Sequence, residues 1–205
     1  MNRLFAAAAI LPAILPLAFA GLVSGTAFAA EPSVIGDWLV KEGWANIRID
    51  DCNGKMWGIV VWEKAPGFDK ENPDPAKKNR PLLGTPVLMG LAPTKEPGHW
   101  TGEIYNSNDG KMYSATISLA DENTLDLQGC LGSSGFSSWL CQTQQWTRVK
   151  SPPPNAAPLP PIKGAAGPQS KQAAAKKGAA PAVSDTCQRI AEDAAAQERE
   201  NASKK

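Results

Sequence analysis

The sequence is poor in the residues that build metal and catalytic sites. It has a single histidine, His99, and its four cysteines form no C-x-x-C pair. A zinc site needs three or four ligands from cysteine, histidine and carboxylate side chains, so a zinc enzyme is disfavoured. Residues 132–135 lack the G-x-S-x-G pattern of a serine nucleophile, and Cys52 follows two aspartates, whose charge opposes a reactive thiolate. We therefore expect no enzyme, no metal ion and no cofactor.

A surplus of charge of either sign is also missing. The chain has 21 Lys and Arg against 20 Asp and Glu, and Arg3 is the sole charged residue among the first thirty. Cleavage after Ala29 would therefore leave equal numbers of basic and acidic residues. A balanced chain has no electrostatic attraction to nucleic acid or to an anionic membrane, so we expect no nucleic-acid partner.

A long apolar run occurs only at the N-terminus. Residues 1–3 carry a positive charge, residues 4–23 are almost wholly apolar, and residues 27–29 supply small side chains for cleavage. This three-part pattern predicts a secretory signal peptide over residues 1–29. The rival interpretation is an uncleaved anchor, since the run is nearly long enough to span a bilayer, but Pro12 and Pro16 favour cleavage. We expect a periplasmic or secreted protein with no integral membrane segment after cleavage.

Residues 34–149 show no helical periodicity, and apolar and polar residues alternate there between turn residues. Asn53-Gly54 and Asp109-Gly110 are suited to tight hairpin turns. The expected strands cover residues 36–41, 44–50, 56–62, 86–91, 99–105, 112–119, 125–131 and 139–149. This is an all-β pattern, and eight antiparallel strands are best closed into an up-and-down barrel, which leaves no exposed edge. A sandwich is the competing architecture.

The longest connection inside this domain covers residues 63–84. Asn72 and Asp74 each precede a proline, which favours extended backbone and leaves their side chains free to accept backbone N–H groups. A loop of this length is usually functional or disordered. One interpretation is a lid over the barrel mouth, with Asp74 and Arg80 contacting a ligand or each other. The other is a rigid, proline-rich crossover that these side chains merely tie down.

Aromatic residues are spread over most of the expected strands: Trp38, Trp57, Trp62, Trp100, Tyr105, Tyr113, Trp139 and Trp146. The inside of a small barrel is either filled by such side chains or lined by them around one small ligand. Trp57 and Trp62 have opposite phase, so both can point inward only if a bulge intervenes. If there is a ligand, the candidate contacts are Asn72, Asp74, Arg80, Tyr105, Tyr113 and Trp57.

The four cysteines predict disulfides, as expected for an exported chain with an even count. Cys130 and Cys141 flank a Gly- and Ser-rich loop and are the best candidates for a bridge across a hairpin. Cys52 is either free or bonded to Cys187. The sequence leaves this choice open, because it depends on geometry.

The composition changes abruptly after residue 149. Residues 150–183 are rich in Pro, Ala and Lys and are expected to form a disordered linker, since they bury too little apolar area to offset their ordering entropy. Residues 184–205 can form a short helix. Ile190 is nearly the only large apolar residue in it, so we expect this helix to fray unless Cys187 tethers it.

Four stretches resemble an exported bacterial family known as domain-of-unknown-function family 2147. They are Ile35-Gly36-Asp37-Trp38; Asn72-Pro73-Asp74-Pro75 with Arg80-Pro81-Leu82-Leu83-Gly84; Ile104-Tyr105-Asn106 with Asp109-Gly110-Lys111-Met112-Tyr113; and Gly129-Cys130-Leu131-Gly132 with Leu140-Cys141-Gln142 through Trp146-Thr147-Arg148. The resemblance implies a lipocalin-like barrel and no established activity. It also implies a structural pairing of Trp38 with Arg148 that closes the barrel bottom. Family members often carry a second cysteine where this chain has Trp57.

Two functions remain open at this stage. The first is a binding module that holds a small, partly apolar molecule in the barrel, closed by the loop around residues 72–84. The second is a non-catalytic envelope protein with a filled barrel and a tail that contacts an envelope component.

Overall fold

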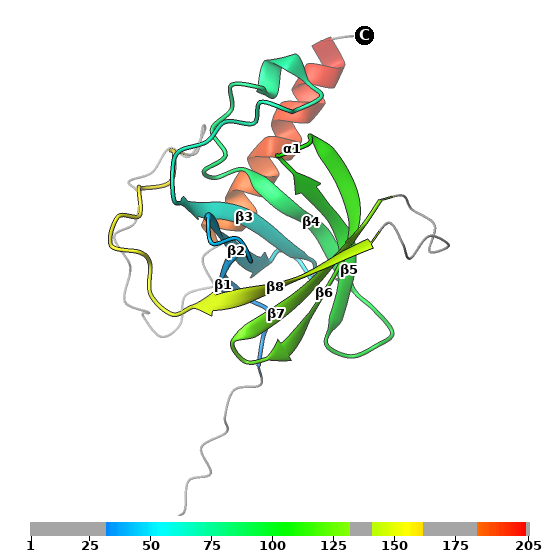
Figure 1. Ribbon diagram of the computed structural model, residues 1–205. Coiled ribbons are helices and arrows are strands. Elements are labelled where there is room, and N and C mark those ends of the chain that lie inside the picture. Colours follow the sequence, from blue (N-terminus) through cyan, green and yellow to red (C-terminus); the bar gives the residue numbers. More distant parts are fainter. Residues whose placement is uncertain (1–31, 132–140, 162–183, 204–205) are drawn as a thin grey trace, which may run out of the picture. The chain divides into compact units, whose positions relative to one another are not determined.

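The structure is a computed structural model that describes residues 32–131, 141–161 and 184–203. Eight strands form a closed antiparallel barrel in which each strand pairs with its neighbour in sequence (Figure 1). The strands are β1 (Gly36–Leu39), β2 (Ala45–Asp51), β3 (Met56–Glu63), β4 (Pro86–Pro93), β5 (His99–Asn106), β6 (Lys111–Asp121), β7 (Thr124–Cys130) and β8 (Cys141–Val149). The predicted up-and-down barrel is confirmed, and the pairing of β1 with β8 excludes a sandwich. The predicted signal peptide, Trp139 and residues 162–183 of the predicted linker lie outside the described residues.

The barrel closes where β1 meets β8. Trp38 is fully buried and lies opposite Arg148 across this seam. The guanidinium carbon of Arg148 lies 4.1 Å from the centre of the Trp38 ring, and its nitrogens donate to the backbone carbonyls of Ser33, Ile35 and Glu122. Gly36 adopts a φ of 136°, and a Cβ there would lie 2.8 Å from Arg148 Nη1. One end of the barrel, called here the Arg148 end, is therefore sealed by side chains.

The hydrophobic core fills the interior of the barrel. Alternation along each strand places one face inside. The buried side chains of this interior are Trp38, Ile47, Ile49, Met56, Val60, Leu88, Leu91, Ala115, Ile117, Leu125, Leu127 and Trp146. Burial at this level is typical of a packed core and leaves little space between these side chains.

A β-bulge changes the phase of β3 along its length. Ile47 pairs with Val60, whereas the preceding residue Asn46 pairs with Trp62, so Val61 is extra. A bulge of this kind moves the following side chain to the other face. Trp57 and Trp62 therefore both lie on the outer face of β3, rather than inside the barrel.

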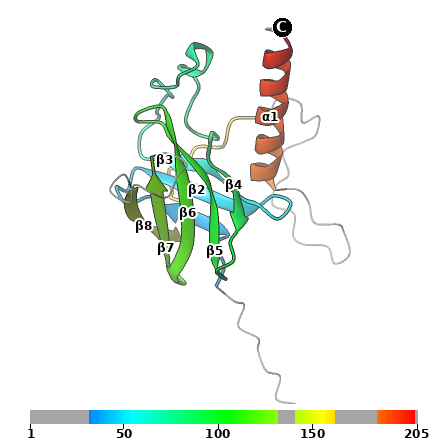
Figure 2. The ribbon, with the colours of Figure 1, turned by 90° about the vertical axis from the view of Figure 1, so that its right-hand side faces the viewer.

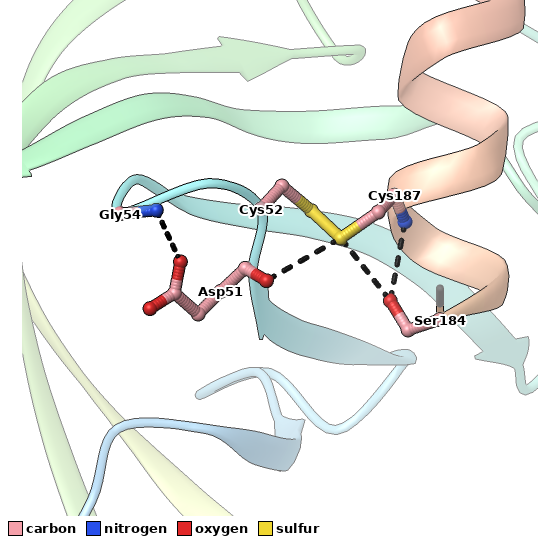
Figure 3. Close-up of a disulfide and its surroundings, with 5 residues drawn as sticks. All are labelled: Asp51, Cys52, Gly54, Ser184 and Cys187. Carbon is pink, nitrogen blue, oxygen red and sulfur yellow. Dashed lines mark hydrogen bonds between the residues drawn. A yellow bond between two sulfur atoms is a disulfide. The ribbon is translucent and has the colours of Figure 1, made fainter. Parts of the chain in front are cut away.

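The C-terminal helix α1 (Asp185–Ser203) contacts β2 and β3. A disulfide joins Cys187 in its first turn to Cys52 in the β2–β3 turn (Figure 3). The Ser184 hydroxyl accepts a hydrogen bond from the Cys187 backbone N–H at 3.2 Å and so caps the helix start. Ile59 points outward from β3, yet it is fully buried, because the C-terminal segment covers this face. No helix of the described residues is long and apolar enough to cross a membrane.

Candidate functional site

A buried polar cluster ties the long β3–β4 loop to the barrel wall. Its centre is Asp69, which is fully buried. The Asp69 carboxylate accepts hydrogen bonds from the Tyr105 hydroxyl at 2.6 Å, Asn72 Nδ2 at 2.7 Å and Arg80 Nη2 at 2.8 Å. These four residues are called here the Asp69 cluster. They join the loop to β5, because Tyr105 is the strand residue among them.

The proline-rich part of the loop shapes this cluster locally. Asn72 Oδ1 accepts from the Asp74 backbone N–H at 2.9 Å, and Asp74 caps the short helix η1 (Pro75–Lys77) by accepting from Ala76 N. A proline at the first helical position is favoured because its φ suits the helix and its N–H is not needed. The Asn-Pro-Asp-Pro sequence therefore builds a turn in which Asp74 serves as a cap.

The cluster lies on the outer side of the barrel wall. Tyr105 pairs with Met112 and alternates with the inward-facing Ile104, so its ring leaves the wall on the side where the loop passes. The loop extends beyond the barrel at the end where the β5–β6 turn lies (Figure 2). A Cβ at Gly110 in that turn would overlap the backbone carbonyl of Glu71, so loop and turn are in close contact.

The electrostatics of the cluster favour a protonated tyrosine. Burial, followed by the hydrogen bond to Asp69, raises the pKa of Tyr105 to about 12, while the charge of Arg80 opposes this rise. Three donors converge on the Asp69 carboxylate, which balances its buried charge. Arg80 Nε is buried and has no hydrogen-bond partner among the described residues. The side-chain oxygens and the Asn72 amide of the cluster are paired, and this arrangement fits a rigid tie better than a set of groups waiting for a ligand.

The six candidate ligand contacts do not form one site. The structure brings Asn72, Arg80 and Tyr105 together around Asp69. Trp57 lies on the outer face of β3, with its ring 3.6 Å from where a Cβ on Gly90 would stand. The remaining two are Asp74, which caps η1, and Tyr113, which faces the interior. Asp69 itself was missed, although an acidic residue three positions before Asn72 in the same loop was an available signal.

The barrel end opposite Arg148 is called here the Tyr113 end. Ile104 and Tyr113 face each other across β5 and β6 on the interior side, and both are half-buried. Gly129 on β7 contributes no side chain to this layer. Leu131, which follows it in alternation, is 41% exposed. This end therefore presents a partly exposed apolar rim.

The polar groups of the rim have defined roles. The Tyr113 hydroxyl donates to Asp109 Oδ2, and this hydrogen bond, followed by burial, raises the pKa of Tyr113. The rim thus combines apolar surface with one phenol, a composition typical of sites for small molecules that are mainly apolar.

Two of the pockets formed by the described residues lie outside the barrel interior. One, of about 330 Å³, lies at the Arg148 end and is lined by Pro32, Ser33, Ile35, Glu122, Asn123, Arg148 and Lys150. The other, of about 170 Å³, lies on the outer wall between β1–β3 and residues 152–159. Within the described part of the chain, no three His, Cys, Asp or Glu side chains are grouped so that they could hold a metal ion.

Comparisons with known proteins give a family and one similar fold. Residues 36–148 match the model of a family described as uncharacterised proteins conserved in bacteria, DUF2147. A solved structure, protein HP1028 of Helicobacter pylori, described as belonging to the lipocalin family, is similar with a TM-score of 0.51 and 22% identity. The likeness covers 57% of this chain and 83% of that one. The search of curated proteins gave no match.

Proposed function

The chain belongs to the DUF2147 family, and from this membership and its lipocalin-like barrel we propose that it is an exported, non-catalytic binding protein. Its ligand is a small, partly apolar molecule held at the Tyr113 end of the barrel. The alternative location, deep inside the barrel, has little room because the interior between Trp38 and Leu88 is packed.

One observation carries this proposal, namely the difference between the two ends of the barrel. At the Arg148 end, Trp38, Trp146 and Leu125 are buried and Arg148 seals the seam, although the interior-facing Trp100 and Leu119 keep partial exposure there as well. At the Tyr113 end, apolar side chains facing the interior keep partial exposure. Apolar surface exposed to water at a barrel mouth costs free energy unless something covers it. A ligand that covers this surface therefore gains the most binding free energy at the Tyr113 end.

The Asp69 cluster supports the proposal indirectly. It fixes the β3–β4 loop against β5 beside the Tyr113 end, so the loop forms a wall that is already ordered before a ligand arrives. Binding to such a wall loses little conformational entropy. In this interpretation Asn72, Arg80 and Tyr105 position the loop, while Tyr113 contacts the ligand.

Export is supported by the disulfides. Cys52–Cys187 and Cys130–Cys141 use all four cysteines. Bonds of this kind persist in oxidising compartments such as the periplasm, which agrees with the signal peptide expected over residues 1–29.

Native mass spectrometry of the protein purified gently from producing cells tests the proposal. We expect a reproducible extra mass that dissociates on denaturation. Leu131→Glu places a charge on the rim and should lower occupancy about tenfold or more. Met112→Glu is the matched control, because Met112 is similarly exposed, at 39%, but lies on the outer face of β6. A clean apo mass, or equal loss of ligand in both variants, would contradict the proposal.

The second candidate is an envelope interaction protein that uses the barrel as a filled scaffold. The packed interior favours it. Cys187 is bonded within the chain, so a partner would be held by non-covalent contacts. Deleting residues 162–205 should then change the localisation of the protein or abolish its cross-linking to an envelope component. Unchanged localisation and cross-linking would remove this candidate.

A further inference from the structure

Helix α1 presents one face to the β3–β4 loop. Arg189, Asp193 and Gln197 recur at four-residue spacing, so their side chains lie on one face of the helix. Gln197 Oε1 accepts a hydrogen bond from Lys77 Nζ at 2.5 Å, and Asp193 Oδ2 accepts one from Arg80 Nη1 at 3.4 Å. These three helix residues are called here the α1 stripe, and the stripe lies along the loop.

Arg189 extends this contact near the start of the helix. Its Nη2 donates to the Pro160 carbonyl at 2.6 Å, and its Nη1 lies 3.0 Å from where a Cβ on Gly84 would stand. Gly84 belongs to the loop, and Pro160 belongs to the segment that follows β8. The stripe therefore contacts two segments that are distant from each other in sequence.

Arg80 connects the stripe to the Asp69 cluster. Its Nη2 donates to Asp69 at 2.8 Å, and its Nη1 faces Asp193. The loop is thus held on one side by β5, through Tyr105 and Asp69, and on the other side by α1. A change in the position of α1 therefore reaches the loop directly.

The stripe depends on the disulfide between Cys52 and Cys187. Asp193 is 54% exposed, and ion pairs at such positions contribute little individually. The helix has few large apolar residues, and a free helix of this kind frays. The disulfide keeps its first turn beside the β2–β3 turn and so gives the stripe a high effective concentration at the loop. Loss of this bond should release the stripe contacts together.

The two disulfides differ in what keeps their cysteines together once they are reduced. Cys130 and Cys141 are direct partners in the ladder between β7 and β8, so their thiols stay adjacent and the bond re-forms readily. Cys52 and Cys187 are brought together by the weak contacts of α1 alone. Because a lower effective concentration of the two thiols favours the reduced form, Cys52–Cys187 is the easier bond to reduce. Both of its cysteines are half-buried, so a reductant can reach it.

The two sulfur atoms of this disulfide have different surroundings. Cys187 lies in the first turn of α1, where backbone N–H groups stabilise a thiolate, and the Ser184 hydroxyl donates to its Sγ at 3.2 Å (Figure 3). The exposed Asp185 in the same turn and the Asp51 carbonyl at 3.5 Å oppose this effect. Cys52 has no helix start to stabilise it and follows two aspartates, whose charge disfavours a thiolate. Cys187 is therefore the better leaving group.

We propose that Cys52–Cys187 is a redox-sensitive switch, which a dithiol opens in preference to Cys130–Cys141 and which releases the α1 stripe from the β3–β4 loop. A thiolate of the dithiol attacks Cys52 Sγ, a mixed disulfide forms, and Cys187 leaves as a thiolate. The second thiol of the dithiol then displaces Cys52. The protein gains two electrons and two protons, and the dithiol becomes a disulfide.

The first test measures the order in which the two disulfides are reduced in the purified protein. The protein is equilibrated without oxygen in mixtures of reduced and oxidised dithiothreitol, free thiols are alkylated, and each cysteine peptide is quantified by mass spectrometry. Where half of Cys52–Cys187 is reduced, we expect about nine-tenths of Cys130–Cys141 to remain oxidised, which corresponds to about a tenfold difference in equilibrium constant. Equal reduction of both bonds, or earlier reduction of Cys130–Cys141, would overturn the proposal.

The second test measures hydrogen exchange of the loop in the variant Cys52→Ser with Cys187→Ser. The backbone amides of Asp69, Arg80 and Leu82 are hydrogen-bonded within the loop. We expect them to exchange about threefold faster or more once α1 is released. The serine variant of the other disulfide is the control, because α1 stays attached there and the three amides should keep their rates in native conditions. Unchanged loop exchange in the first variant would overturn the proposal.

A charge reversal tests the stripe while the disulfide is intact. Asp193→Lys sets a cation against Arg80 and should also accelerate exchange of the loop amides. Glu198→Lys is the matched control, because it makes the same change of charge at an exposed position on a different face of α1. Equal loop exchange in these two variants would overturn the role of the stripe. None of these measurements uses a ligand, so their failure is distinguishable from failure of binding at the Tyr113 end.

Discussion

The barrel and the C-terminal helix are held in place by different means. The barrel has a continuous hydrogen-bonded ladder around eight strands and a shared core. Helix α1 has a disulfide at its first turn and a few polar contacts along its length, such as Arg80 with Asp193 at 3.4 Å. Asp193 is 54% exposed, and exposed ion pairs of this kind contribute little.

This difference indicates that the two regions differ in their stability. A helix of this length with few large apolar residues is marginal alone, so α1 depends on its attachment. The following predictions test whether damage to one region leaves the other intact.

The largest effect is expected in the barrel. Trp38→Ala removes a fully buried ring, its hydrogen bond to the Val34 carbonyl at 2.8 Å and its contact with Arg148. We expect the free energy of unfolding to fall by about 3 to 5 kcal/mol, measured by urea denaturation. Trp38→Phe keeps most of the packing and should cost less. A loss below about 1 kcal/mol for the alanine variant would show that the seam does not hold the barrel closed.

An intermediate effect concerns the attachment of the β3–β4 loop and depends on pH. The folded protein raises the pKa of Tyr105 to about 12, above the usual value near 10. The protonated phenol therefore stabilises the fold fully below about pH 10, and this stabilisation is lost as the pH rises towards 12.

The pH-dependent part should amount to about 2 to 3 kcal/mol. It is measured as the difference between the unaltered protein and Tyr105→Phe in urea denaturation at pH 8 and at alkaline pH. The phenylalanine variant is less stable at pH 8, and the gap should narrow as pH increases. A gap that stays constant would show that folding does not raise the pKa of Tyr105.

The smallest effect on the barrel is expected from releasing α1. Replacing Cys52 and Cys187 together by serine opens the loop that this disulfide closes. In the folded state this releases the tail alone, and in the unfolded state it releases the whole chain between the two cysteines. The entropy of closing a loop grows slowly with loop length, so the two gains in entropy nearly cancel, and the free energy of unfolding of the barrel should fall by about 1 kcal/mol or less. Hydrogen exchange of α1 amides should nevertheless become much faster.

The matched control for this variant is the other disulfide. Replacing Cys130 and Cys141 by serine opens a link across the β7–β8 hairpin and should destabilise the barrel by about 2 to 3 kcal/mol, with α1 exchange in native conditions unchanged. If the first pair of substitutions unfolded the barrel, the two regions would form one cooperative unit.

Alternation in the sequence was sufficient to predict the barrel. The eight expected strands differ from β1–β8 by only a few residues at their ends, because each alternating run is bounded by Gly, Asn, Asp or Pro. Closure followed from the strand count, since an open sheet of this size leaves two edges. The architecture was therefore a local property of the sequence.

The remaining features depend on contacts between distant residues. The sequence left open whether Cys52 bonds to Cys187, because a separation of 135 residues carries no geometric information. The bulge at Val61, which turns Trp62 outward, has no glycine to mark it. Asp69 has only one signal in the sequence, its position three residues before Asn72, and its importance depends on Tyr105, which reaches it from β5.

The measurement that tests the proposed function most directly compares three isoleucine methyl groups during titration with decanoate, a small and partly apolar probe. Ile104 lies at the Tyr113 end, Ile117 lies in the packed interior, and Ile35 is 41% exposed beside the pocket at the Arg148 end. We expect the methyl signal of Ile104 to shift at millimolar decanoate while those of Ile117 and Ile35 stay in place. A shift confined to Ile35, or no shift at Ile104, would contradict a binding site at the Tyr113 end.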